Sequence, residues 1–81
     1  MLRDKSATKE MIILCVVNNL KELRKSRNMR QQDLADATGY NRRTISRIER
    51  HEADPSAEFM LRMAAYFGVL VEDVFRIDES A

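Results

Sequence analysis

The sequence predicts an all-α fold, a single domain of five short helices, with a short two-stranded antiparallel sheet expected from the ends of the chain. Composition is the first reason: among 81 residues, 44% are hydrophobic and 33% are charged, with only two glycines and one proline. This balance is typical of compact helical proteins rather than disordered or fibrous ones. The second reason is that apolar residues recur at helical spacing along most of the chain. The third is that capping residues or glycines separate these stretches.

The two ends of the domain are predicted to form the sheet. Residues 12–17 lie in a short apolar run rich in isoleucine and valine, which favours a strand over a buried helix. Residues 75–78 alternate apolar and polar side chains and are the natural antiparallel partner. Residues 1–10 are polar and lack apolar periodicity, so we interpret them as a flexible leader. A single domain then covers residues 11–78, followed by a tail at 79–81.

The first two helices are placed by the residues at their ends. Asn18 or Asn19 can cap a first helix that runs to about residue 27. A second helix is expected at 31–38. Gly39 follows it and supplies the positive φ that a sharp turn between two helices requires.

Two further caps place the remaining helices. Asn41 can cap a third helix that runs to about Arg50. Ser56 can cap a fourth helix, and Gly68 lies where a glycine would end it. Residues 70–75 suggest one further short turn or helix, which brings the expected number of helices to five.

Several kinds of function find no support in the sequence. The apolar run at 11–17 has seven residues, against the roughly 20 that a membrane-spanning helix needs, and the pattern of a signal peptide is missing. A cytoplasmic protein is therefore expected, with Cys15 as a small buried side chain rather than a nucleophile. His51, Glu52 and Asp54 form a poor metal-ligand set and are interpreted as a solvated loop. Without a catalytic triad or a phosphate-binding glycine loop, we expect no enzyme activity.

Charge is distributed unevenly along the chain, although the formal net charge is only +1. Residues 1–50 contain twelve Lys or Arg and six Asp or Glu, a balance of +6, whereas residues 51–81 contain two and seven, a balance of −5. The amino-terminal part can therefore face phosphates while the acidic part points elsewhere.

The third helix concentrates positive charge on one face. At roughly 100° per residue, five side chains fall within an arc of about 140°: Arg42, Ser46, Arg50, Arg43 and Arg47. Ile45 and Ile48 point the other way, no acidic residue lies within the arc, and Glu49 is at its edge. A solvated face would ordinarily mix both signs of charge. We therefore favour a surface whose guanidinium groups grip guanine edges or phosphates in the DNA major groove.

Residues 19–75, about 70% of the chain, resemble the Cro/CI-type (XRE) helix-turn-helix family of bacterial and phage transcriptional regulators. The segments that carry the resemblance are MRQQDLA, NRRTISRIE and DPSAEFMLRMAAYFGVLVEDVF. Taken together they are specific. The resemblance implies a five-helix lambda-repressor-like DNA-binding domain.

The resemblance also implies roles for individual residues. Contacts to base edges are implied for Arg42, Arg43, Ser46 and Arg47. Contacts to the DNA backbone are implied for Gln31, Asn41, Thr44 and Arg50, and Gln31 would also help to fix the third helix. Arg24 and Glu49 match positions that often pair with each other. The core of the motif would be Leu34, Ala35, Ile45 and Ile48.

Three positions depart from the family pattern. Arg30 stands where a Ser or Thr cap is common, so a capping bond worth roughly 1 kcal/mol is exchanged for a contact to the DNA backbone. His51 replaces a frequent glycine after the third helix and costs about 1 kcal/mol or more if its backbone is left-handed. Val71 replaces a polar cap and weakens only the last short helix.

A homodimer is expected because a single recognition helix contacts only about four base pairs. The partner would be double-stranded operator DNA, an inverted repeat with half-sites about 34 Å apart. The chain is most similar to the small cytolysin-operon-repressor-like subtype, in which the chain ends form a sheet beside the dimer contact. Our candidates for the apolar interface are Phe67, Val69, Leu70 and Val74.

The predicted function is that of a dimeric repressor that binds promoter DNA and blocks transcription. The alternative is an antitoxin or another protein-interaction module built on the same fold. Such a module would keep the buried isoleucines but would not need an acid-free arginine face. No cofactor, metal ion or small-molecule ligand is expected, and the methionines and phenylalanines of the fourth helix are interpreted as core.

Overall fold

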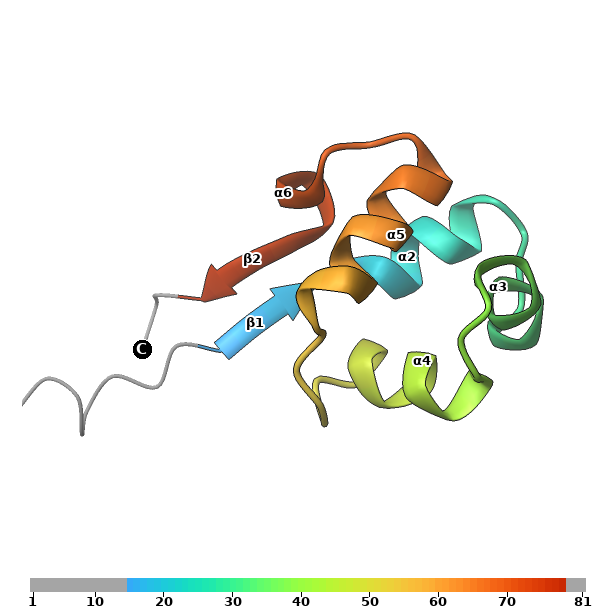
Figure 1. Ribbon diagram of the computed structural model, residues 1–81, viewed down its shortest axis with the longest axis horizontal. Helices are drawn as coiled ribbons and strands as arrows, with labels where there is room; N and C mark the ends of the chain where they lie inside the picture. The colour runs from blue at the N-terminus through green and yellow to red at the C-terminus, as the bar shows by residue number, and fades with distance from the viewer. Residues whose placement is uncertain (1–14, 79–81) are drawn as a thin grey trace, which may run out of the picture.

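The structure, a computed structural model, describes residues 15–78. In chain order its elements are β1 (Cys15–Asn18), α2 (Leu20–Ser26), α3 (Gln31–Thr38), α4 (Arg42–Glu49), α5 (Ala57–Phe67), α6 (Val71–Val74) and β2 (Phe75–Asp78). The predicted fold, five helices with a small antiparallel sheet, is confirmed (Figure 1). The predicted leader, the tail and residues 12–14 of the first predicted strand lie outside the described residues. Within 15–78, no helix is long and apolar enough to cross a membrane.

The sheet joins the beginning and the end of the helical part. β1 pairs antiparallel with β2, so that Cys15 lies opposite Asp78 and Asn18 lies opposite Phe75. The strand extends to Asn18, one residue further than the sequence predicts. Figure 1 shows the two strands projecting to one side of the helices. The sheet therefore adds an extension to the helical core rather than a second layer beneath it.

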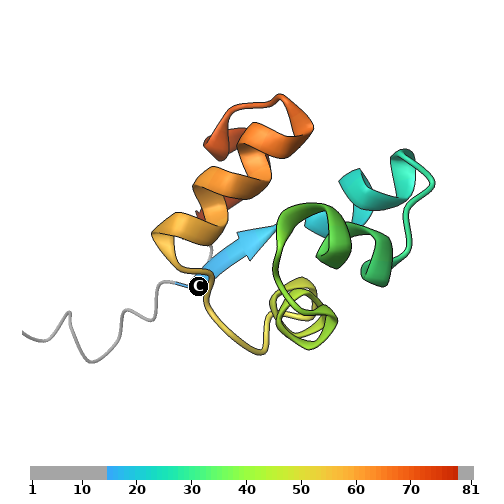
Figure 2. The ribbon, with the colours of Figure 1, turned by 45° about the vertical axis from the view of Figure 1, so that its right-hand side comes forward.

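Every helix contributes to one core. The fully buried large side chains are Leu20, Leu34, Ile45, Phe59, Met63 and Val74. In α5, Phe59, Met63 and Phe67 are buried, as predicted, and Met60 is partly buried and packs against the same core. α4 lies at the lower edge of the molecule in both views (Figures 1 and 2). One side of α4 faces this core, and the other side faces solvent.

Three helices, α2, α4 and α5, have a side chain that accepts a hydrogen bond from a backbone N–H in their first turn. Asn41 and Ser56 each accept a hydrogen bond from the backbone N–H three residues further on, at 2.8 and 3.0 Å, which confirms both predicted caps. At the start of α2, Asn18 Oδ1 accepts from the backbone N–H of Leu20 at 2.9 Å. Asn19, the residue in the N-cap position, makes no such bond. Of the two predicted alternatives, Asn18 is therefore the one that satisfies the helix.

α3 and α6 begin without an accepting side chain at the N-cap and instead use an acid one turn into the helix. Asp33 accepts from the backbone N–H of Arg30 at 2.8 Å, and Asp73 accepts from that of Leu70 at 3.0 Å. These bonds supply one half of a capping box. Val71 is the first residue of α6 rather than its cap, so the predicted weakening at Val71 is wrong in position.

Four helices end at a residue with a left-handed backbone. The residues are Asn28, Gly39, His51 and Gly68, with φ of 58°, 84°, 63° and 73°. The predicted turn at Gly39 and the predicted end at Gly68 are confirmed. His51 adopts the left-handed backbone, so the condition for its predicted conformational free-energy cost is met. The left-handed backbone of Asn28 was not predicted.

Candidate nucleic-acid interface

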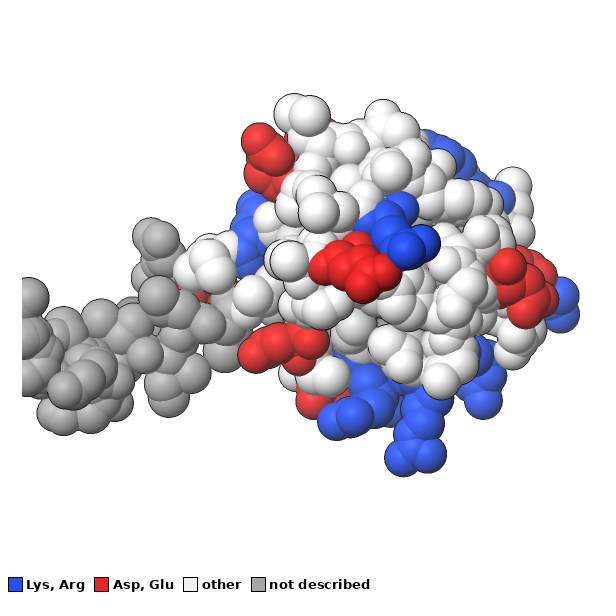
Figure 3. Space-filling model, in the orientation of Figure 1, with Lys and Arg blue, Asp and Glu red and all other residues white. Residues whose placement is uncertain are grey.

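α4 presents its positive charge to solvent because its other side is fixed in the core. Ile45 and Ile48 are buried, with exposed fractions of 0% and 3%. On the opposite side lie the exposed side chains that we call the arginine face: Arg42, Arg43, Arg47 and Arg50. Figure 3 shows Lys and Arg gathered along the lower edge of the molecule, where Figure 1 places α4.

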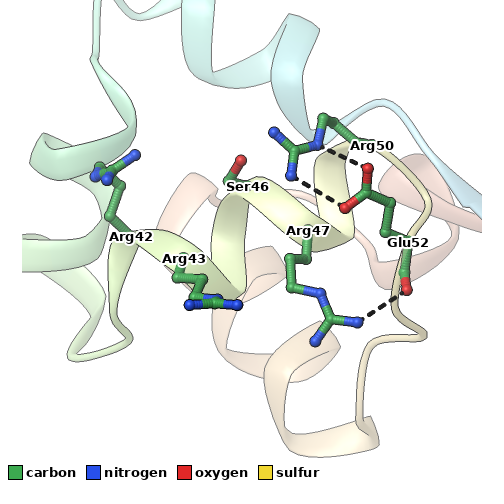
Figure 4. Close-up of a pocket in the computed structure, with 6 residues that line it drawn as sticks. All are labelled: Arg42, Arg43, Ser46, Arg47, Arg50 and Glu52. Carbon is green, nitrogen blue, oxygen red and sulfur yellow. Dashed lines mark hydrogen bonds and ion pairs between the residues drawn. The ribbon is translucent and has the colours of Figure 1, made fainter.

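The four arginines of the arginine face differ in their hydrogen-bond and ion-pair partners within the protein. Arg42 and Arg43 have no hydrogen-bond or ion-pair partner within residues 15–78. Arg47 donates from Nη2 to the backbone oxygen of Glu52 at 3.3 Å, which leaves its charge unpaired. Arg50 is neutralised by the carboxylate of Glu52 (Figure 4). The unneutralised charge therefore lies toward the amino-terminal end of α4.

Ser46 lies at the bottom of this surface rather than on its rim. A shallow hollow of about 380 Å³ is lined by the arginine face together with Ser46 and Glu52. Ser46 is only 8% exposed, whereas the arginines around it are exposed. Of the four side chains predicted to contact base edges, Ser46 thus offers the least surface to a partner.

Glu52 lies beside the arginine face because of the turn that ends α4. The N–H of His51 donates to the carbonyl of Ile48 at 3.0 Å and that of Glu52 to the carbonyl of Arg47 at 2.8 Å, the bond pattern of a Schellman motif around a left-handed residue. This motif turns the chain back, so that Glu52 accepts from Arg50 Nε and Nη2 at 3.1 and 3.0 Å. The helical arc itself contains no acid, but the folded surface does.

The guanidinium of Arg50 lowers the pKa of the Glu52 carboxyl, mainly through their hydrogen bonds and also through its charge, to which Arg47 adds. Glu52 is therefore a carboxylate at neutral pH. Sequence reasoning missed this residue because it considered only the helical wheel. The positive φ anticipated for His51 was the available signal, since a left-handed residue at the end of a helix folds the next residue back over the last turn.

A buried ion pair fixes the carboxy-terminal end of α4. Arg24 of α2 donates from Nε and Nη2 to the two carboxylate oxygens of Glu49, at 2.7 and 3.0 Å. The side chains of Arg24 and Glu49 are only 7% and 1% exposed. Arg24 Nη1 also donates to the backbone oxygen of Met29 at 2.8 Å. The two residues that the resemblance pairs are thus in contact, and they join α2 to α4.

Gln31, at the start of α3, takes part in the same network. Its Nε2 donates to Glu49 Oε1 at 3.0 Å, so one side chain of α3 also holds α4 in place. An amide nitrogen has two N–H groups, which leaves one donor for a phosphate. Gln31 is half-buried, so both roles assigned to it are compatible with its position.

Arg30 is engaged within its own helix end. Its guanidinium donates from Nε and Nη2 to the Asp33 carboxylate, at 3.1 and 2.9 Å. These hydrogen bonds, with the bond from the Arg30 backbone, lower the pKa of Asp33 to about 2. The Arg30 side chain remains exposed, but its charge is balanced by Asp33 in this structure.

A contact between β1 and α4 has no counterpart in the sequence patterns. Asn18 Nδ2 donates to the backbone oxygen of Ile48 at 3.0 Å, and the Asn18 backbone N–H donates to His51 Nε2 at 3.4 Å. The residue that caps α2 therefore also satisfies a carbonyl in the last turn of α4. The sheet and α4 are connected at this point.

Two of the four residues predicted at a dimer interface belong to the interior of the chain. Phe67 and Val74 are 4% and 1% exposed, because they pack in the core, so they offer almost no surface to a second copy of the chain. Val69 is half-buried, whereas Leu70 is 62% exposed. Of the candidates, Leu70 alone presents a large apolar side chain to solvent.

Comparison with known proteins identifies the family. A helix-turn-helix family model matches residues 20–74, from the start of α2 to the end of α6. An uncharacterized HTH-type transcriptional regulator of Methanocaldococcus jannaschii is 43% identical over 58 residues, covering 72% of this chain and 88% of the relative. A second, from Archaeoglobus fulgidus, is 37% identical over 60 residues, covering 74% and 84%. A third, from Bacillus subtilis, is 34% identical over 62 residues, covering 76% and 94%.

The fold also matches a solved structure. The crystal structure of a proposed DNA-binding protein from Bacteroides fragilis superposes with a TM-score of 0.67 and covers 75% of this chain and 98% of its own. Because the two sequences are only 21% identical, this likeness concerns the fold alone. The family match and the three sequence relatives lead to one conclusion: the chain belongs to the XRE family of helix-turn-helix proteins, and the relatives it matches are named transcriptional regulators.

Proposed function

We propose that this protein is a sequence-specific double-stranded-DNA-binding transcriptional regulator that reads the major groove with α4 and acts as a homodimeric repressor. The observation that carries the proposal is the state of Arg42 and Arg43. Both are exposed at the amino-terminal end of a firmly anchored helix, and neither has a partner within residues 15–78. A surface of unpaired guanidinium groups needs an anionic or acceptor-rich partner, and DNA supplies both.

In this proposal the arginines make the contacts with base edges. A guanidinium is a planar fork that can donate two parallel hydrogen bonds to O6 and N7 of guanine. Arg42, Arg43 and Arg47 are the readers. Ser46 forms the floor of the same surface, where a small side chain allows the base edges to approach α4.

Contacts to phosphates orient the protein on the duplex. Gln31, Asn41 and Thr44 lie at the starts of α3 and α4, where backbone N–H groups and the helix dipole favour anions. Arg30 and Arg50 are further backbone contacts. Each of these two must share or release its own carboxylate partner, Asp33 or Glu52, before it can neutralise a phosphate.

Dimerisation would place two copies of α4 in successive major grooves of an inverted repeat. Exposed apolar side chains supply candidate contact surface, with Leu70 62% and Ile77 47% exposed. Ile77 lies in the sheet made by the chain ends, and such a sheet supports the cytolysin-operon-repressor-like arrangement. Repression would follow because a dimer that covers promoter DNA excludes the polymerase.

The test is selection of duplexes from a randomised DNA pool by the purified protein at near-physiological salt, followed by sequencing. We expect an enriched inverted repeat with half-sites about one helical turn apart. Absence of enrichment from a folded protein would refute the proposal and favour the protein-interaction alternative.

A pair of variants assigns the binding to α4. The double substitution Arg43→Ala and Arg47→Ala should abolish enrichment without changing the melting temperature, because both side chains are exposed. Arg62→Ala is the matched control, since Arg62 is an exposed arginine on α5 that pairs with Glu58 and lies outside the arginine face. Equal loss of binding in the control would mean that total charge, rather than α4, determines binding.

A further inference from the structure

Glu52 is the one acidic side chain among the described residues that line the hollow on the arginine face. Four hydrogen bonds to Arg47 and Arg50 fix its position. Its backbone N–H donates to the carbonyl of Arg47 at 2.8 Å, its backbone oxygen accepts from the Arg47 side chain at 3.3 Å, and its carboxylate accepts two bonds from Arg50. Figure 4 shows Glu52 between these two arginines at the end of α4. The carboxylate is thus held in one orientation before any partner arrives.

The Glu52 carboxylate can still accept further hydrogen bonds. Its side chain is 52% exposed, and each carboxylate oxygen uses only one of its acceptor positions on Arg50. The arginines around it can only donate. In the major groove, guanine presents acceptors, whereas cytosine N4 and adenine N6 are donors. A fixed acceptor therefore adds a kind of recognition that the arginines lack.

We propose that Glu52 is a specificity-determining residue: oriented by Arg50, its carboxylate accepts a hydrogen bond from a base amino group and disfavours duplexes that do not offer one. This inference rests on the proposed function of α4 as the reading helix. The same carboxylate occupies Arg50 in the free protein, so DNA of unrelated sequence gains one phosphate contact fewer than the number of arginines suggests. Both effects widen the gap between operator and unrelated DNA.

The substitution Glu52→Gln tests the proposal, with Glu58→Gln as a matched control. Each variant removes one negative charge and breaks one exposed Glu–Arg pair, since Glu58 accepts from Arg62 at 2.7 Å with a side-chain exposure of 67%. Glu58 lies on α5 and does not line the hollow. Dissociation constants are measured for the selected operator and for an unrelated duplex of equal length over a range of salt concentrations.

For Glu52→Gln we expect affinity for the unrelated duplex to rise about tenfold, with a salt dependence steeper by about 0.9 in log–log slope because Arg50 is released to a phosphate. The ratio between operator and unrelated affinity should fall by about tenfold or more, and a repeated selection should lose preference at one base pair. Glu58→Gln should leave the ratio unchanged.

Arg50→Ala provides a second readout, because it removes the group that orients Glu52. It should relax preference at the same base pair as Glu52→Gln. Loss of preference at a different base pair, or an equal rise in affinity for both duplexes in Glu52→Gln, would overturn the role of Glu52. If the wild-type protein itself shows no sequence preference, the proposed function fails with it, so the two failures are distinguished before any variant is compared.

Discussion

Glu49 connects three helices through one carboxylate, which accepts hydrogen bonds from Arg24 of α2 and from Gln31 of α3. Truncating it would leave the Arg24 charge buried without compensation. We therefore predict that Glu49→Ala lowers the free energy of unfolding by about 3 to 5 kcal/mol, measured by urea denaturation. In a domain of this size that is a large part of the total stability.

A double variant separates the cost of a lone buried charge from the worth of the pair. Replacing both partners, Arg24→Met with Glu49→Leu, removes the two charges together and should be less destabilising than Glu49→Ala alone. If the double variant lost as much free energy of unfolding as Arg24→Met and Glu49→Leu lose together, the prediction would be contradicted, because additive losses mean that the two side chains do not interact.

Arg43 and Gln31 should affect DNA binding in different ways. Arg43 has no partner within residues 15–78 and is assigned to a base edge, so Arg43→Ala should cost about 1 to 3 kcal/mol of operator binding and relax preference at one position. Gln31→Ala removes a phosphate contact and should weaken binding to all sequences alike. The measurement is a dissociation constant for the operator and for each single-base variant of it.

The control for this comparison is stability, because Gln31 also donates to Glu49. Melting temperatures are measured for both variants, and binding is compared well below the lower of the two. The same pattern of losses across base variants for both substitutions would contradict the division into base readers and phosphate contacts.

At the scale of whole elements, the ends of the helices follow a common pattern. After α2, α4 and α5, the left-handed residue and the residue that follows it donate to carbonyls in the last turn, and after α3 a single bond does so. Glycine occupies this position at Gly39 and Gly68, whereas Asn28 and His51 adopt it with a side chain. Asparagine tolerates this backbone comparatively well, so His51 bears the larger conformational cost.

We predict that His51→Gly raises the free energy of unfolding by up to about 1 kcal/mol, because glycine adopts a positive φ without strain. The gain is reduced by loss of the long 3.4 Å bond that His51 Nε2 accepts from Asn18. Thermal or urea denaturation checks it. A less stable variant would mean that this bond outweighs the backbone strain.

Gly39→Ala is the converse experiment. A Cβ at Gly39 would meet no atom within 4 Å, so any effect comes from its φ of 84° alone. A loss of about 1 kcal/mol is expected. Both variants measure the free-energy cost of a left-handed backbone for a residue with a side chain: His51→Gly removes this cost and Gly39→Ala introduces it.

At the scale of the whole molecule, charge is arranged by position in space. The net charge is only +1, yet the exposed arginines of α4 gather on one side of the molecule (Figure 3). In the proposed function, DNA binding therefore depends on this local surface rather than on the total charge of the protein. We predict that log K for DNA falls with log salt concentration, by about 0.9 for each phosphate neutralised.

This salt dependence is measured by titrating a labelled operator duplex at several salt concentrations between low and physiological values. Arg42→Ala should leave the slope nearly unchanged, because Arg42 is assigned to a base edge, and a reduced slope would reassign Arg42 to a phosphate. A flat response in the wild-type protein would contradict an interface built on arginines and phosphates.

The local features of this protein could be predicted from its amino-acid sequence. The caps at Asn41 and Ser56, the turn at Gly39, and the opposition of Ile45 to the arginines of α4 all depend on residues within a few positions of one another. Local hydrogen bonding and helical periodicity therefore sufficed to predict them. The antiparallel pairing of the two chain ends also followed, since each end carries a short strand pattern.

Other features depend on how the helices and loops pack together, which local sequence patterns do not specify. The burial of Phe67 and Val74 follows from how the helices pack together, and hydrophobicity alone cannot separate a core residue from an interface residue. Ser46 shares a helical face with exposed arginines, yet its short side chain leaves it at the bottom of that surface. The return of Glu52 onto α4 depends on a left-handed backbone, which a helical wheel does not represent. In each case the exposed surface of a residue is set by atoms from other elements or from the chain beyond the helix, and only folding brings those atoms together.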